Sequence, residues 1–330
     1  MQIRPIHATD ADFAAWYDVH LGARLADYPT GPLWLEPELR VIYQGTEHRA
    51  VQLWLAEEDG RAVGAAVLDL PLRDNLTLAE PEVFVRPDES RRGVGAALLA
   101  TLDEASKAAG RTSQLIYLEG PTGTGHTSGT AFAEKHGFTR RITEICRVQR
   151  PPFDLDGIAR AEETARPHAA GYRVVTWSDH APVELVDEYA RLQGRMSTDP
   201  PLGELDYEPE TWDAARIRTS ERRYDRMRRD TWVAAALAPD GTMAGVTEIT
   251  LSRDSDATGF QEATIVDPRH RGHRLGLLLK AANLRRLLAD RPGVQTVWTW
   301  NAESNAHMIA INETLGYRVA GWSAAYQRTL

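Results

Sequence analysis

Cysteine is almost absent from this chain of 330 residues. Cys146 is the only one, so no disulfide can form within the chain and a cysteine-rich zinc site is excluded. The ten histidines are scattered without the spacing of metal ligands. We therefore expect no metal cofactor, and a reducing cytoplasm as the protein's location.

Long apolar segments and an excess of basic charge are also missing. No apolar run approaches the roughly 20 residues that span a bilayer, and Met1–Pro5 lacks the basic start and apolar continuation of a secretory signal. The 38 basic against 47 acidic side chains give a formal net charge of -9. We therefore expect neither a membrane nor nucleic acid as a partner, because phosphate binding requires a concentrated cationic face.

The chain does contain an internal repeat. Several short motifs recur in the same order, each 181 positions later: Asp59-Gly60 as Asp240-Gly241, Gly64 as Gly245, Val85-x-Pro87 as Val266-x-Pro268, and Gly95 as Gly276. A proline-rich and then Ala/Glu-rich stretch separates the copies. We predict an N-terminal domain at residues 1–150, a linker at 151–170 and a C-terminal domain at 171–330; this length also favours two domains.

Both copies predict the same order of elements. A short strand and a helix precede two apolar segments joined at an Asp-Gly turn, which is typical of a β-hairpin with positive φ at both central positions. A strand, a glycine-bearing turn and a long helix follow, and then a strand, a shorter helix and a last strand. This order predicts an α/β (α+β) fold in each domain, a mixed and mostly antiparallel sheet flanked by helices.

A basic turn joins a strand to the long helix in both copies. In copy one its candidate phosphate-binding residues are Val85, Arg91, Arg92, Gly93, Val94, Gly95 and Ala96, and in copy two Val266, Arg271, Gly272, His273, Arg274, Leu275 and Gly276. Free N–H groups at a helix N-terminus attract anions, glycine permits close approach and arginine adds charge. The pattern is neither a P-loop nor a dinucleotide fingerprint.

These motifs, with a downstream Asn-bearing helix that ends in Leu315-Gly316-Tyr317, resemble the GNAT family of acetyl-CoA-dependent N-acetyltransferases. The resemblance covers nearly the whole chain twice, in a two-domain layout similar to that of mycothiol synthase. It implies acetyl-CoA as co-substrate, a turn that cradles the CoA pyrophosphate, a carbonyl polarised by a backbone N–H on the strand that ends at Val266, and no metal.

Both turns depart from the family's Arg/Gln-x-x-Gly-x-Gly/Ala pattern. Ser90 replaces the leading residue in copy one, and Arg274 replaces the first glycine in copy two. A left-handed Arg274 would cost about 1–2 kcal/mol. We expect instead that Arg274 is already helical, because Gly272 can relieve the turn.

The Asn-bearing helix distinguishes the copies. Asn305 and Asn312 lie at helical spacing in copy two. The resemblance implies that Asn305 contacts the CoA arm, and Asn312, on the same face, is a further candidate for cofactor binding; the alternative is that both only cap or solvate the helix. Copy one has His126 and Ala133 at these positions. The tyrosine that often serves the family as acid is missing in both. We predict that copy two is catalytic and copy one degenerate.

Three side chains are candidates for proton transfer in copy two. Glu262, on the strand before the turn, is the first candidate base, and Glu248, on the preceding strand, is the second; Glu82 is the comparable residue of copy one. Tyr326, on the last strand, is the candidate acid for the thiol. Each could instead be an ordinary surface or packing residue.

The acceptor is the least determined feature. The acidic segment Ser197–Glu208 lies where the family shapes its acceptor pocket, and its charge favours a small cationic amine. A charged run from Arg222 to Arg229 is expected to be a solvated helix. Three functions remain open: a small-molecule N-acetyltransferase, a non-catalytic acetyl-CoA sensor or scaffold, and an acetyltransferase for protein lysines or N-termini. The oligomeric state cannot be inferred.

Overall fold

The structure, a computed structural model, describes residues 1–330 and divides into two compact units. Unit 1 comprises Met1–Glu144, Gly203–Glu208 and Gly321–Leu330, and unit 2 comprises Ile145–Leu202 and Pro209–Ala320. The units therefore do not follow the contiguous ranges 1–150 and 171–330. The last strand of the second repeat belongs to unit 1.

The first repeat forms the elements predicted for it, with one additional short helix. They are β1 (Gln2–Ile6), α1 (Phe13–Asp27), α2 (Glu36–Ile42), β2 (Arg49–Glu58), β3 (Arg61–Pro71), β4 (Leu78–Val85), a 3-10 turn (Pro87–Glu89), α3 (Val94–Ala108), β5 (Ser113–Pro121), α4 (Ser128–Lys135) and β6 (Thr139–Gln149).

The remainder of the chain repeats this order after one extra helix. Its elements are α5 (Leu155–Ala165), β7 (Arg173–Ser178), α6 (Val186–Gly194), α7 (Ala214–Met227), β8 (Arg229–Leu237), β9 (Met243–Ser252), β10 (Gly259–Val266), α8 (Leu275–Asp290), β11 (Val297–Ala302), α9 (Ala306–Thr314) and β12 (Arg318–Thr329), with short 3-10 turns at Arg166–Ala169, Arg195–Ser197 and Pro268–His270.

Each unit is built on a mixed, mostly antiparallel sheet, which confirms the predicted fold class. Unit 1 has the order β1-β2-β3-β4-β5-β12, and unit 2 has β11-β10-β9-β8-β7 with the end of β6 beside β11. The parallel pairs are β4 with β5 and β10 with β11. None of the helices combines the length and apolar composition that a membrane span requires.

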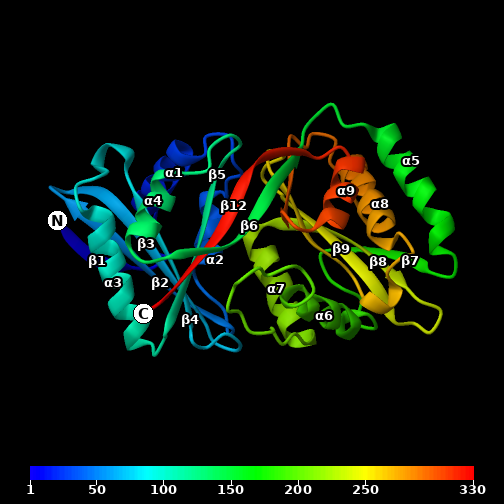
Figure 1. Cartoon of the computed structure of the whole chain (residues 1–330), viewed down its shortest axis with the longest axis horizontal. Coiled ribbons are helices and arrows are strands. Elements are labelled where there is room, and N and C mark those ends of the chain that lie inside the picture. Colours follow the sequence, from blue (N-terminus) through cyan, green and yellow to red (C-terminus); the bar gives the residue numbers. More distant parts are fainter. The chain divides into compact units, whose positions relative to one another are not determined.

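Alternating side chains of the strands pack against helices on both faces of each sheet. In unit 2, α6 and α7 cover one face, and α5, α8 and α9 cover the other (Figure 1). The predicted linker is therefore structured, because α5 buries Ile158 and Ala161 in the core against α8. In unit 1, α1 and α2 cover one face and α3 covers the other.

The two Asp-Gly turns differ. Asp59 and Gly60 both have positive φ, 51° and 77°, between β2 and β3, as predicted for a two-residue hairpin. Between β8 and β9 only Gly241 has positive φ, 88°, so the prediction is wrong for Asp240. The connection there is longer, from Ala238 to Thr242, and contains Pro239, whose ring holds φ negative before Asp240.

Candidate active site

A β-bulge in β10 places two carboxylates at the same point of the sheet of unit 2. Thr264 pairs with Thr247 and Gln261 pairs with Ile249, so Glu262 and Ala263 together lie opposite Glu248. A bulge of this kind bends the strand and redirects side chains. The equivalent strands β3 and β4 of unit 1 keep one register from Gly64 to Asp69, and Val67 occupies the position of Glu248.

The bulge lies where two parallel strands separate. β10 pairs with β11 only at Gly259 and Phe260, so the rest of β10 presents backbone groups that have no partner on that strand. In unit 1, β4 pairs with β5 only at Leu78 and Ala79. Both units thus have the splayed strands at which a carbonyl could meet backbone N–H groups, and unit 2 adds Glu248 where unit 1 has Val67.

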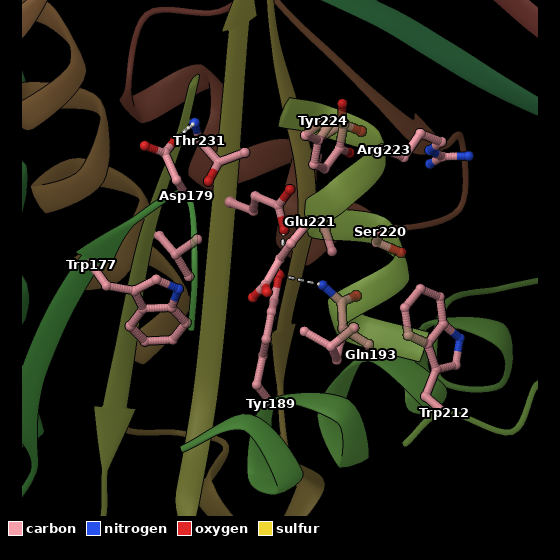
Figure 2. Close-up of a pocket in the computed structure, with 15 residues that line it drawn as sticks. Trp177, Asp179, Tyr189, Gln193, Trp212, Ser220, Glu221, Arg223, Tyr224 and Thr231 are labelled. Atoms are coloured by element: carbon pink, nitrogen blue, oxygen red, sulfur yellow. Dashed lines mark hydrogen bonds between the residues drawn. The ribbon is translucent and has the colours of Figure 1, made fainter. Parts of the chain in front are cut away.

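A pocket of about 180 Å³ opens at the bulge, between the sheet and the helices α6 and α7. Figure 2 shows Trp177 and Asp179 on one side, Tyr189 and Gln193 on α6, and Arg223 and Tyr224 on α7. The lining residues are Trp177, Asp179, Tyr189, Gln193, Trp212, Ile217, Ser220, Glu221, Arg223, Tyr224, Thr231, Val233, Glu248, Glu262 and Ala263. Aromatic walls with several carboxylates suit a cationic ligand.

Glu248 is held at the buried side of the pocket. The Tyr189 hydroxyl donates a hydrogen bond to its carboxylate, and the Gln193 amide donates to the Tyr189 hydroxyl at 2.8 Å (Figure 2). Burial raises the pKa of Glu248 to about 7, against the lowering effect of the Tyr189 hydrogen bond. This carboxyl can therefore exchange a proton near neutral pH.

Glu262 is half-buried and lies in a more cationic environment. Thr250 Oγ1 donates to Glu262 Oε1 at 3.2 Å. Burial raises the pKa of Glu262, whereas Arg229, the Thr250 hydrogen bond and Arg223 lower it. The structure thus brings both predicted bases, Glu262 and Glu248, to one pocket.

The corresponding region of unit 1 is filled with apolar and aromatic side chains. Val67 is fully buried, and His20 lies between Trp16 and Phe84, with ring centroids 5.5 and 4.6 Å away. Glu82, the candidate of copy one, lies on β4, where burial raises its pKa to about 7, against the lowering effect of Arg24. Unit 1 therefore has one carboxyl with a raised pKa at this place, and Val67 stands where unit 2 has Glu248.

The prediction that Arg274 is helical is wrong. Arg274 has φ 52° and ψ 23°, the left-handed conformation, and precedes the first residue of α8. Gly272, two residues earlier, has φ 87°. In copy one the same two positions are Arg91 with φ 66° and Gly93 with φ 90°. Each turn therefore needs two left-handed residues, and each supplies one glycine and one arginine, so Gly272 cannot relieve Arg274.

Several basic side chains of the turn in unit 2 are bound to carboxylates. The buried Asp267 accepts hydrogen bonds from Arg191 at 2.8 Å and from Arg269 at 2.9 Å, and these contacts hold the pKa of Asp267 well below its usual range. Arg271 donates to Asp199 at 2.9 Å. His273 and Arg274 are exposed at the N-terminus of α8. Its first N–H groups have no partner within the helix, which makes this end a suitable anion site.

The second glycine of each turn packs against the shorter helix. A Cβ on Gly276 would lie 3.2 Å from Ile311 of α9, and one on Gly95 would lie 3.3 Å from Phe132 of α4. Leu275 and Val94, which begin the two long helices, are buried. These residues fix the helix N-terminus against the core.

The basic turn of unit 1 is also braced by ion pairs. Arg92 binds Glu89 and, at 3.2 Å, Glu58. Arg91 and Ala96 are exposed beside it, and Val85 ends β4. The turn keeps its helix N-terminus, but one of its two adjacent arginines is held by carboxylates.

Asn305 and Asn312 both have structural roles. Asn305 Oδ1 accepts the backbone N–H of Met308 at 3.2 Å, which makes Asn305 the N-cap of α9. Asn312 is fully buried and donates to Asn301 on β11. The capping alternative therefore applies to Asn305. Contact of either residue with CoA stays a prediction.

Tyr326 does not join the pocket of unit 2. It lies on β12 within unit 1, where it pairs with Ile116 of β5. Its buried hydroxyl accepts hydrogen bonds from Arg140 at 2.8 and 2.6 Å. The prediction had placed it with Glu262, because β12 follows the second repeat in the sequence.

The acidic segment Ser197–Glu208 does not line the pocket either. Asp199 binds Arg195 and Arg271. Gly203–Glu208 belongs to unit 1, where the Glu208 N–H donates to Asn75 at 2.7 Å. The pocket's acidic groups are instead Glu248 and Glu262 on the sheet, Glu221 on α7 and Asp179 just after β7.

Sequence reasoning missed the aromatic residues of the pocket and Arg229. Tyr189 and Tyr224 lie on helices whose apolar periodicity gave no sign of a site. Arg229 was expected in a solvated helix, but it begins β8 and is only 2% exposed. The alternation of β8 would have placed it inside, had the strand start been recognised.

Comparisons with known proteins support the resemblance. A profile of the acetyltransferase (GNAT) domain matches residues 49–140, in the first repeat. The mycothiol acetyltransferase of Salinispora arenicola is 29% identical and aligns with 98% of this chain and 90% of its own length, and that of Stackebrandtia nassauensis is 28% identical over 80% and 78%. A solved tandem GNAT protein from the clavulanic acid biosynthesis pathway has a TM-score of 0.78 and 27% identity, and the alignment covers 99% of this chain and 98% of the other.

Over nearly its whole length the chain is similar to tandem GNAT proteins, and its first repeat matches the acetyltransferase (GNAT) domain. It is an N-acetyltransferase, and its fold implies acetyl-CoA as co-substrate. A GCN5-related N-acetyltransferase from Sphaerobacter thermophilus, 17% identical with a TM-score of 0.65, has a similar fold over 99% of this chain.

Proposed function

We propose that this protein transfers the acetyl group of acetyl-CoA to a primary amine of a small cationic molecule, and that unit 2 performs the reaction. The bulge that brings Glu262 and Glu248 to one aromatic pocket carries the proposal. The relatives named mycothiol acetyltransferase favour a small acceptor over a protein.

The residues of unit 2 suit the binding of both reactants. The N-terminus of α8, with Arg274 beside it, would hold the diphosphate of CoA. Acetyl-CoA supplies an activated thioester. Backbone N–H groups of β10 beyond Phe260 would polarise its carbonyl where β11 diverges. The amine would lie between Trp177, Trp212 and the pocket carboxylates.

The two carboxyls have different roles in proton transfer. Glu262, close to Arg229 and Arg223, accepts the amine proton directly or through water. Glu248, whose pKa is about 7, keeps a proton part of the time, so the pocket avoids two adjacent full charges. No metal takes part in the proposal.

Turnover of three variants tests the proposal. Release of free thiol from acetyl-CoA is measured with a panel of small amines and with lysine peptides, for the wild type, Glu262→Gln and the matched variant Glu82→Gln of unit 1. Loss of about 100-fold or more in kcat is expected for Glu262→Gln alone.

The other outcomes separate the alternatives. Loss of activity in Glu82→Gln but not in Glu262→Gln would place the chemistry in unit 1. Preference for peptides would indicate a protein acceptor. An acetyl-CoA-binding protein that releases no thiol with any amine would be a sensor or scaffold.

A further inference from the structure

Arg229 is a buried cation directly behind the pocket. It is 2% exposed at the start of β8, and its guanidinium lies 5.0 Å from the centroid of the Phe260 ring. Removal of a guanidinium from water is costly unless polar partners replace the water. A buried arginine beside a catalytic candidate is therefore expected to have a specific partner.

A chain of hydrogen bonds leads from Arg229 to Glu262. Arg229 Nη2 and Nε donate to Thr250 Oγ1 at 3.0 and 3.3 Å, and Thr250 Oγ1 donates to Glu262 Oε1 at 3.2 Å. The guanidinium can only donate, so the Thr250 hydroxyl accepts from it and keeps its own proton for Glu262. Donation of that proton to Glu262 favours the ionised carboxylate.

The first repeat has a different arrangement at the same place. Arg49 is the first residue of β2 and corresponds to Arg229 in the strand register. Each of the two arginines lies two residues before the residue that pairs with Asp69 or with Thr250. Arg49 binds the carboxylates of Asp69 at 2.8 Å and Glu80 at 2.6 Å. In the second repeat Thr250 and Gln261 stand at these two positions, so the neutralising carboxylates are replaced by neutral side chains. At this place Arg229 donates to the Thr250 hydroxyl, which in turn donates to Glu262.

We propose that Arg229 is a positioning residue that acts through Thr250 to keep the Glu262 carboxylate ionised and oriented at the bulge. The proposal rests on the proposed function of Glu262 as the base. Arg229 touches neither reactant in this assignment. In unit 1 the arginine at the corresponding position binds the carboxylates of Asp69 and Glu80, and neither of these is a candidate base.

Other charged groups also face Glu262, and each must be considered. They are Glu248 on β9, Arg223 and Tyr224 on α7, and Arg229 on β8. Glu248 opposes ionisation of Glu262, whereas both arginines favour it. Arg223 is half-exposed and is screened by solvent and salt, whereas Arg229 is buried and is screened much less.

The experiment measures the ionisation of Glu262 directly. The side-chain carboxyl carbons of glutamate are titrated by NMR, and the Glu262 signal is assigned by its loss in Glu262→Gln. Arg229→Met is expected to raise the pKa of Glu262 by about one or more, and to shift the acidic limb of the kcat/KM profile to higher pH. Arg229→Lys should retain most of the wild-type pKa but lower kcat, because an ammonium cannot reproduce the planar fork.

Two further variants distinguish positioning from simple stability. Thr250→Val keeps the charge but breaks the hydrogen-bond chain, so kcat should fall several-fold with a smaller change in the pKa of Glu262. Arg222→Met, on the exposed side of α7, should leave both quantities unchanged. If Arg229→Met does not fold, the kcat values of Arg229→Lys and Thr250→Val test the proposal.

The proposal is overturned if Arg229→Met leaves the pKa of Glu262 and the acidic limb at their wild-type positions, or, where Arg229→Met does not fold, if Arg229→Lys and Thr250→Val both keep the wild-type kcat. A loss of thermal stability alone would mean that Arg229 is only structural. A wild type without turnover would refute the proposed function but not prevent the NMR titration, so the two failures remain distinguishable.

Discussion

Gly93 and Arg274 occupy the same left-handed backbone position, the residue before the long helix of each repeat. Glycine adopts this conformation without strain, whereas arginine is strained by the contact between its Cβ and the carbonyl oxygen. The strained residue lies in unit 2, at the helix N-terminus to which the proposal assigns the diphosphate. An exposed arginine at a strained position is consistent with selection for binding rather than for stability.

Arg274→Gly is expected to stabilise the protein by about 1 kcal/mol and to weaken acetyl-CoA binding at the same time. Chemical denaturation and isothermal titration measure the two effects. Arg274→Ala is the control, because alanine removes the guanidinium but keeps the strain. Equal stability of the glycine and alanine variants would contradict the argument.

The double variant Arg271→Ala and Arg274→Ala should raise the dissociation constant of acetyl-CoA about tenfold or more, through the loss of charge beside the phosphates. Part of the effect can be offset, since Arg271 already binds Asp199. The matched variant Arg91→Ala and Arg92→Ala reports on unit 1. An unchanged affinity in the first variant, with a loss in the second, would assign the binding to the other turn.

Glu248→Gln should stabilise the protein in a pH-dependent way. Below pH 4.5 the carboxyl is protonated in both the folded and the unfolded chain. As pH rises from 4.5 to 7, the unfolded chain loses this proton while the folded chain keeps it, so the wild type loses up to about 3 kcal/mol of stability. Glutamine avoids this loss. Unfolding measured at pH 4 and pH 8 should show little gain at the lower value and most of it at the higher.

Lys280 should respond to pH in the opposite direction. It is 1% exposed on α8, with its Nζ 5.4 Å from the Tyr317 ring centroid, and burial lowers its pKa to about 7. Between pH 10.5 and 7 the unfolded chain carries a proton that the folded chain lacks, so stability falls as pH falls, by at most about 5 kcal/mol.

Lys280→Met, with a similar volume, should therefore gain several kcal/mol at pH 7 and less at pH 10. The exposed Lys135→Met is the control and should change stability at neither pH. A gain that does not depend on pH would mean that packing, not charge, accounts for the effect.

Local signals in the sequence predicted the fold well. The recurring Asp-Gly and Val-x-Pro motifs identified two copies and the basic turns, because turns depend on the few residues that tolerate their backbone angles. The same reasoning failed at Arg274, because this residue adopts the left-handed conformation although an arginine there is strained. A tolerated strain leaves no local signal.

Features that depend on pairing between distant segments could not be predicted in the same way. The bulge at Glu262 arises from the register of β9 and β10, and the neighbours of Tyr326 depend on which strand β12 joins. Glu262 and Glu248 were found as strand carboxylates, but their shared pocket requires the tertiary structure. The burial of Arg229 was hidden by the basic run that precedes it.

The pairing of β12 with β5 has a consequence for biosynthesis. A ribosome delivers the first repeat long before Gly321–Leu330 emerges, so β5 lacks its neighbour until that segment has been synthesised. A gene divided between the repeats would yield a first product in which β5 lacks β12 and a second product in which β12 lacks β5. The two repeats must therefore be encoded together in one gene, although each has nearly all the elements of a complete domain.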